Sequence, residues 1–108
     1  MAVIHLENKN TQVVARNWRW KRYEIDLVGR KNKTWVFVEV KVRRWGYREA
    51  GIEAVNVQKQ RRIIHAAHTF LRHHEIDAEC IRFDIICIEY ARNTRRIEHI
   101  EDAFVCLP

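Results

Sequence analysis

Long apolar runs and closely spaced cysteines are both missing from this sequence. No segment approaches the ~20 consecutive apolar residues that a membrane-spanning helix requires, so we expect no membrane span. The first residues lack the basic start and the apolar stretch of a signal peptide, which predicts a cytoplasmic protein. Cys80, Cys87 and Cys106 are odd in number and form no Cys-x-x-Cys pair, which disfavours a disulfide framework and a zinc knuckle. Cys87, within Ile-Ile-Cys-Ile, is best interpreted as a small buried hydrophobe.

Repeats, linkers and low-complexity tracts are absent too, so residues 1–108 are predicted to form a single domain. Lys and Arg number 20 against 14 Asp and Glu, which gives a net charge of +6 at pH 7. A small basic domain favours nucleic acid as its partner, although many such domains bind nothing specific.

The segment Trp35–Arg43 is predicted to be a β-strand because β-branched and aromatic residues dominate it. Side chains alternate along a strand, so Glu39 and Lys41 share one face with Trp35, Phe37 and Arg43. The other face consists of valines that are expected to enter a core, at positions 36, 38, 40 and 42. A carboxylate and an ammonium in a buried strand are costly to desolvate, so the pair is either a structural ion pair or part of a catalytic site.

The rest of the chain supplies strands on both sides of one helix. We expect strands at 11–15, 24–30, 81–89 and 97–100, a polar turn at 91–96, a helical or irregular end at 101–105, and at most a short helical turn within 1–10. The helix should run from Ala54 to about His74, with an inward face at three- and four-residue spacing made of Val57, Gln60, Ile63, Ile64, Ala67, Phe70 and Leu71. The strand 81–89 is nearly continuously apolar, which predicts a central strand covered on both faces. Asp84 within it could be a ligand, but a structural role, in which it pairs with a base or caps a neighbouring segment, is favoured.

The strands 24–30 and 34–43 are predicted to form an antiparallel hairpin. In the strand 24–30, Glu24, Asp26 and Val28 share one face, and Ile25 and Leu27 share the other. A two-residue turn at Asn32-Lys33 uses the positive φ that asparagine tolerates. The register that follows has four facing pairs, namely Lys31–Thr34, Val28–Phe37, Asp26–Glu39 and Glu24–Lys41.

Two directly opposed carboxylates repel each other unless a cation or a proton lies between them. Asp26 and Glu39 therefore predict a divalent cation, Mg²⁺ or Mn²⁺, with the backbone carbonyl of Val40 completing the protein ligands. For phosphodiester hydrolysis, Lys41 would steer or help deprotonate the attacking water and neutralise charge developing on phosphorus. Gln60, polar on the inward face of the helix, would position phosphate or water.

The basic residues expected to contact nucleic acid fall in three segments. Asn17–Arg22 interleaves cations with two indoles and could hold phosphates and stack on bases, although each Trp could instead lie on the core. The loop 44–51, hinged at Gly46 and Gly51, could clamp a strand. A stripe of Arg61, His65, His68 and Arg72 on the helix is equally well explained as a solvated face. The predicted contacts are Arg19, Lys21, Arg22, Arg43, Arg44 and Arg61.

The order Asp26, then Glu39-x-Lys41, followed by a helix resembles the PD-(D/E)xK, restriction-endonuclease-like nucleases. More narrowly, the chain is similar to the YraN-like family of small bacterial proteins, through the motifs at 15–19, 24–27, 37–43, 59–62 and 82–84. The resemblance implies an α/β fold with a mixed central sheet flanked by helices, here with a truncated N-terminal helix. It also implies Asp26, Glu39 and Lys41 as the site.

From this resemblance we expect an endonuclease acting on structured DNA rather than RNA. A catalytically impaired nucleic-acid-binding module of the same fold is the alternative. A protein-interaction scaffold, in which Glu39 and Lys41 are only an ion pair, is the third reading. A truncated N-terminal helix would leave one sheet face undercovered, which would favour a homodimer.

Overall fold

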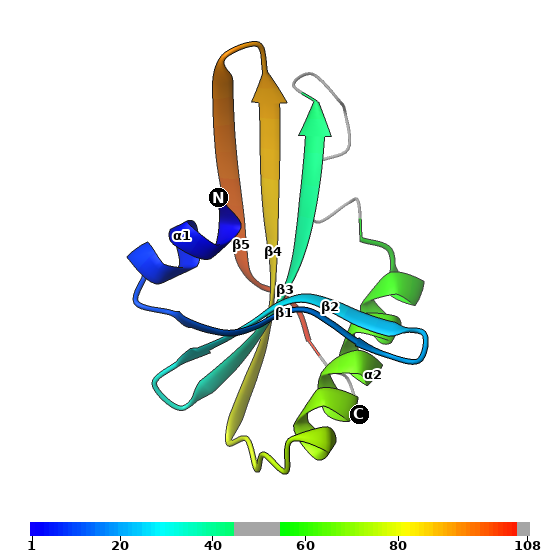
Figure 1. The fold of residues 1–108 in the computed structure, drawn as a ribbon. Helices are drawn as coiled ribbons and strands as arrows, with labels where there is room; N and C mark the ends of the chain where they lie inside the picture. Colours follow the sequence, from blue (N-terminus) through cyan, green and yellow to red (C-terminus); the bar gives the residue numbers. More distant parts are fainter. Residues whose placement is uncertain (45–54, 106–108) are drawn as a thin grey trace.

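A mixed sheet forms the centre of the structure, a computed structural model that describes residues 1–44 and 55–105 (Figure 1). In these residues the strands are β1 (Gln12–Trp20), β2 (Tyr23–Lys31), β3 (Thr34–Arg44), β4 (Cys80–Ala91) and β5 (Thr94–Phe104), and the helices are α1 (Ala2–Asn8) and α2 (Val57–His73). The strands lie in the order β1-β2-β3-β4-β5. Among these five strands only the pairing of β3 with β4 is parallel, and α2 lies in the connection between those two strands. The predicted α/β class of restriction-endonuclease-like folds is therefore confirmed.

The sheet has a hydrophobic core on each face. Phe37, Phe83 and Ile85 pack with α2, whereas Val36, Val38 and Ile86 pack with α1 on the opposite face. This alternation confirms the predicted two faces of β3 and the predicted double cover of β4. β3 continues past both helices (Figure 1), so its predicted core residue Val42 is in fact 53% exposed.

Several element boundaries differ from the prediction because tertiary pairing extends the strands. β1 continues to Trp20, and Trp18 packs edge-on against Phe70 of α2, with ring centroids 5.4 Å apart. The indole of Trp18 thus lies on the core, which was one of the two readings. β5 replaces the predicted short strand and irregular end, because Phe104 pairs with Phe83 and stacks on its ring at 5.1 Å.

Helix α2 begins three residues later than predicted. Asn56 caps it, since its side chain accepts a hydrogen bond of 2.9 Å from the Lys59 amide. Val57, predicted to face inward, is 60% exposed, because it lies in the first turn beyond the packed part of the helix. The rest of the predicted inward stripe is confirmed from Ile63 to Leu71.

Helix α1 is longer than the predicted single turn and covers part of the second sheet face. Ala2 and Leu6 are its buried residues, and they pack with Leu27 and Val38. The homodimer that an undercovered face would favour stays a prediction.

A buried polar network joins β4, β5 and α1. Asp84 is fully buried and accepts hydrogen bonds from Arg82 (2.8 and 2.9 Å), His99 Nε2 (2.7 Å) and the Asp102 amide (3.0 Å). Burial alone would raise the pKa of this carboxyl, but the bonds from His99 and Arg82 outweigh it and hold the pKa below its usual range. Asp84 is therefore structural, as predicted.

The same network tethers α1 through two histidines. Because the ionised Asp84 only accepts, His99 donates from Nε2, and in its neutral form its Nδ1 can accept from His5 Nε2, which lies 3.1 Å away. Burial lowers the pKa of His5, and the neighbouring His99 and Lys9 lower it further. Lys9 is in turn 3.9 Å from Glu101. Two protonated rings would oppose N–H to N–H, so acid pH should weaken this tether.

We expect the stability contribution of His5 to be complete above about pH 6.5 and to fall as pH drops below it, because the unfolded chain then binds the proton more readily. Thermal unfolding of the wild type and of His5→Gln between about pH 7 and pH 5 measures this. The wild type should lose stability more steeply than His5→Gln. A control variant on the same helix, Ile4→Gln, replaces a side chain that is 62% exposed and adds no titrating group, so it should keep the wild-type slope. Parallel curves for wild type and His5→Gln would contradict the assignment.

Candidate functional site

The β2–β3 ladder ends where the candidate site begins. Its pairs run from Lys31–Thr34 through Val28–Phe37 to Leu27–Val38, and Asn32 in the turn has a φ of 56°, so the predicted turn and register are confirmed over this part. The predicted facing pairs Asp26–Glu39 and Glu24–Lys41 are wrong, because the ladder does not extend to them. Instead, Asp26 Oδ2 accepts a 2.8 Å hydrogen bond from the Val40 amide. The carboxylate thus lies between the two strands as they separate.

The β1 residue that faces Asp26 has an unusual backbone conformation. Asn17 has a φ of 48° and lies between the pairs Arg16–Leu27 and Trp18–Ile25, in the position facing Asp26. Ile25 and Val28 pack in the core under α2, although regular alternation would place Ile25 with Leu27 on the other face. The predicted face assignment of the strand is therefore wrong at Ile25. At Asp26, which lies between Ile25 and Leu27, β2 therefore departs from regular alternation.

Glu39 is the acidic centre of the site. It is 8% exposed, and its Oε1 lies 3.2 Å from Lys59 Nζ and 3.6 Å from Lys41 Nζ. Burial raises the pKa of Glu39, the charge of Asp26 raises it further, and the two lysines offset only part of the rise. Asp26 and Glu39 are thus close enough to repel each other even though they do not face across the ladder.

Lys59 was not among the predicted site residues. Burial would lower the pKa of its ammonium, but the charge of Glu39 and the hydrogen bond to that carboxylate outweigh burial and raise it. The sequence does carry a signal for it, because Lys59 stands one turn before Ile63 on the stripe that continues through Ala66 and Phe70. The neighbouring Gln60, predicted to reach the site, donates from Nε2 to the Val55 carbonyl at 3.1 Å.

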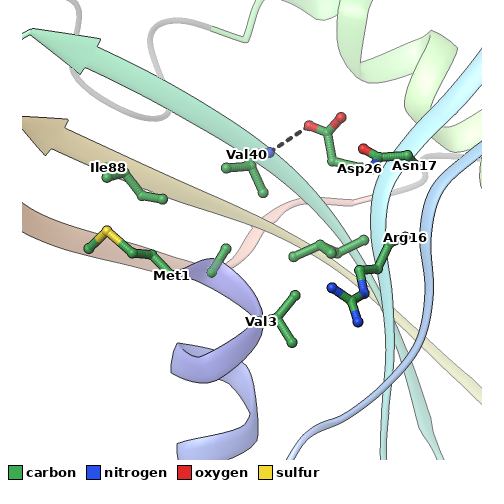
Figure 2. A pocket seen from close by; sticks show the side chains of 9 residues that line it. Met1, Val3, Arg16, Asn17, Asp26, Val40 and Ile88 are labelled. Carbon is green, nitrogen blue, oxygen red and sulfur yellow. Dashed lines mark hydrogen bonds between the residues drawn. The ribbon is translucent and has the colours of Figure 1, made fainter.

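A pocket of about 380 Å³ opens beside Asp26 on the side of the sheet that carries α1 (Figure 2). Arg16, Asn17 and Asp26 contribute its polar wall from β1 and β2. Figure 2 shows Met1 and Val3 of the α1 end across from them. The gap between β2 and β3 is therefore open to solvent next to the carboxylate, which leaves room for a ligand.

Comparison with known proteins gives the chain relatives along almost its whole length. The profile of the "Uncharacterised protein family UPF0102" matches residues 1–88. The chain belongs to the UPF0102 family. A UPF0102 protein of Geobacter metallireducens is 44% identical over 105 residues, which are 96% of this chain and 85% of that protein. UPF0102 proteins of Chlorobium chlorochromatii and Bacteroides fragilis are 39% and 41% identical, over 96% and 95% of this chain and 84% of each relative.

UPF0102 is the YraN-like family, so the resemblance seen in the motifs is confirmed. The family description assigns no activity, so the activity of this UPF0102 protein has to be inferred from the side chains at its candidate site. Neither helix among the described residues has the length and apolar character needed to cross a bilayer.

The two carboxylates of this UPF0102 protein are the type of ligand that a hard divalent cation prefers. No third His, Cys, Asp or Glu joins them within residues 1–44 and 55–105, since no group of three such side chains gathers there. Mg²⁺ is commonly bound through one or two carboxylates, with waters and substrate phosphate oxygens completing its six ligands. The repulsion that raises the pKa of Glu39 is the kind of interaction that a cation between the two groups would relieve. Ligation by the Val40 carbonyl stays a prediction.

The predicted nucleic-acid contacts of the UPF0102 chain lie in separate places around the site. Arg19, Lys21 and Arg22 are exposed at the end of the β1–β2 hairpin, where Arg19 is 3.3 Å from Glu24. Arg43 and Arg44 are at the end of β3, and the exposed Arg61 is in the second turn of α2. The rest of the predicted loop 44–51 lies outside the described residues.

Proposed function

We propose that this UPF0102 protein is a divalent-metal-dependent endonuclease that hydrolyses phosphodiester bonds in structured DNA. The observation that supports this function best is the meeting of Asp26, Glu39, Lys41 and Lys59 at the point where β2 and β3 separate. Two carboxylates and two ammonium groups gathered in this way are suited to a reaction in which a cation and a phosphate are bound together.

Asp26 and Glu39 would hold the cation, which when bound would polarise the scissile phosphate and make water a better nucleophile. The Val40 amide fixes Asp26 Oδ2, so this carboxylate is oriented before any ligand arrives. Glu39 is held by strand β3 within the core, and its charge is compensated by Lys41 and Lys59. Both ligands are therefore preorganised by main-chain elements rather than by flexible loops.

Lys41 and Lys59 have complementary positions for the phosphate. Lys41 has a side chain that is 14% exposed and comes from the same strand as Glu39, whereas Lys59 is 43% exposed at the start of α2. With a cation held by Asp26 and Glu39, the ammonium groups of Lys41 and Lys59 would be available to bind phosphate oxygens and to neutralise charge that develops on phosphorus. The more exposed Lys59 would meet the substrate first, and Lys41 would lie closer to the reacting centre.

Replacing Asp26 with Asn should abolish metal binding and reduce cleavage by about 10²–10³-fold, because one ligand charge is lost. Calorimetric titration of Mg²⁺ and Mn²⁺ into wild type and Asp26→Asn measures the first effect, and cleavage of a DNA four-way junction measures the second. Asp77→Asn, an exposed acid between α2 and β4, should bind metal and cut like the wild type. Equal metal affinity of wild type and Asp26→Asn would refute the metal site.

A non-catalytic DNA-binding module is the second candidate function. It is favoured by the two ion pairs of Glu39, because the ammonium groups of Lys41 and Lys59 neutralise the charge of this carboxylate without a metal. Wild-type protein that binds junction DNA in the presence of Mg²⁺ or Mn²⁺ without cutting it would establish this function instead of the first.

A further inference from the structure

The end of the β1–β2 hairpin exposes a large aromatic side chain. We call residues 20–23 the β1–β2 tip; Trp20 and Tyr23 form the last pair of the ladder, and Lys21 turns the chain with a φ of 53°. Trp20 is 39% exposed, whereas Trp18 on the same strand is packed against the core. Of the two indoles in this segment, one is therefore structural and the other is presented to solvent.

Two histidine rings of helix α2 pack against the aromatic rings of the tip. The ring of His73 lies 4.2 Å from that of Trp20, and the ring of His65 stacks on Tyr23 at 6.3 Å, centroid to centroid. The exposed indole is thus held by a hairpin and a helix rather than by a mobile loop. A rigid aromatic surface loses little conformational entropy when a ligand stacks on it.

Cations accompany the rings of the tip. Lys21 Nζ lies 5.7 Å from the centre of the Trp20 ring, and the Arg22 guanidinium lies 6.0 Å from that of Tyr23. Side chains that combine a positive charge with an aromatic face are the usual means of holding a single nucleic-acid strand, because phosphates contact the cations and bases stack on the rings. Lys21 is exposed, and the four-carbon stem of a lysine can reorient, so its ammonium can move from the indole to a phosphate when a base stacks on the ring.

We infer that the β1–β2 tip is a stacking platform for an unpaired nucleotide of the DNA substrate. Bases within a duplex already stack on one another, so an indole can reach a base face only at an end, a flap or a branch. Asp26 lies three residues beyond Tyr23 on β2, roughly 10 Å along the strand, so a nucleotide on the tip would hold the branch beside the carboxylates. The inference rests on the proposed function, since it names the feature of structured DNA that the protein would recognise.

The experiment compares binding of two DNA molecules in metal-free buffer, by fluorescence anisotropy. One is a blunt duplex and the other is the same duplex with a single-stranded overhang. Wild type should prefer the overhang, and Trp20→Leu should reduce that affinity by about 5- to 100-fold with little change for the blunt duplex. Trp20→Phe, which keeps an aromatic ring, should retain most of the preference.

Tyr90→Leu is the matched control. Tyr90 is 38% exposed and carries Arg95 5.8 Å from its ring centre, but it lies at the end of the β4–β5 hairpin. The variant should bind both DNA molecules like the wild type. The inference would be overturned if wild type and Trp20→Leu preferred the overhang DNA over the blunt duplex to the same degree. It would also be overturned if Trp20→Leu and Tyr90→Leu lost the same affinity for the overhang DNA. If Trp20→Leu fails to fold, the double variant Lys21→Glu/Arg22→Glu should weaken overhang binding more than blunt binding, and equal weakening would overturn it.

The endonuclease proposal and the stacking-platform proposal can each be refuted without refuting the other. A wild type that prefers the overhang but cuts no DNA with Mg²⁺ or Mn²⁺ would refute the endonuclease and support the platform. A wild type that cuts junctions while Trp20→Leu binds and cuts equally well would refute the platform alone.

Discussion

Replacing Asp84 with Ala is expected to destabilise the fold by about 3–5 kcal/mol. The substitution removes the acceptor for Arg82, for His99 and for the Asp102 amide at once, and it leaves a guanidinium that is 23% exposed without its bidentate partner. Asp84→Asn should cost less, because its amide oxygen can still accept one of these bonds. Urea unfolding followed by circular dichroism measures both losses.

A surface ion pair provides the control for this prediction. Arg19 and Glu24 are 3.3 Å apart, with side chains 74% and 62% exposed, so Arg19→Ala should change stability by less than about 1 kcal/mol. An Asp84→Ala protein that unfolds at the same urea concentration as Arg19→Ala would show that the buried network does not hold β4, β5 and α1 together.

Replacing Glu39 with Gln should reduce cleavage by about 10²–10³-fold and yet leave the metal-free protein at least as stable as the wild type. The pKa of Glu39 is raised in the folded state, so its ionised form lowers stability once the pH exceeds the ordinary range of a glutamate. Glutamine has nearly the same shape and cannot ionise, so this loss disappears. Thermal unfolding at neutral pH and the junction-cleavage assay together measure the two effects.

Glu98→Gln, an exposed substitution on β5, is the matched control and should leave both stability and cleavage unchanged. A Glu39→Gln protein that unfolds at a much lower temperature than Glu98→Gln would show that the ion pairs with Lys41 and Lys59 stabilise the fold, as the scaffold reading requires.

Local patterns were sufficient to predict the β2–β3 hairpin. Alternating valines defined the faces of β3, and the tolerance of asparagine for positive φ defined the turn at Asn32, so the pair Val28–Phe37 followed from counting. The same reasoning located Glu39 and Lys41 on one face of β3. These features depend only on a two-residue period and on one turn, both of which are readable in the chain.

The structure differs from the prediction where the conformation of one segment depends on its packing against another. Nothing within β2 alone indicates that Ile25 and Leu27 pack on opposite sides. The residue with the positive φ at this point, Asn17, is on the neighbouring strand. Lys59 was missed in favour of Gln60 because the predicted inward stripe was counted from Val57, which lies outside the core. A stripe counted backwards from Phe70 would have reached Lys59.

The parallel pairing of β3 with β4 has a consequence for how the protein folds. The β1–β2, β2–β3 and β4–β5 pairs are all local in sequence and can form early, whereas Thr34 and Cys80 meet only after the chain closes a long crossover. Lys59 belongs to that crossover, and it reaches Glu39 only when α2 has docked. Glu39 therefore gains its ammonium partner Lys59 in the slow, non-local step of folding. The site is complete only when the whole domain has folded, and not when the β2–β3 hairpin has formed.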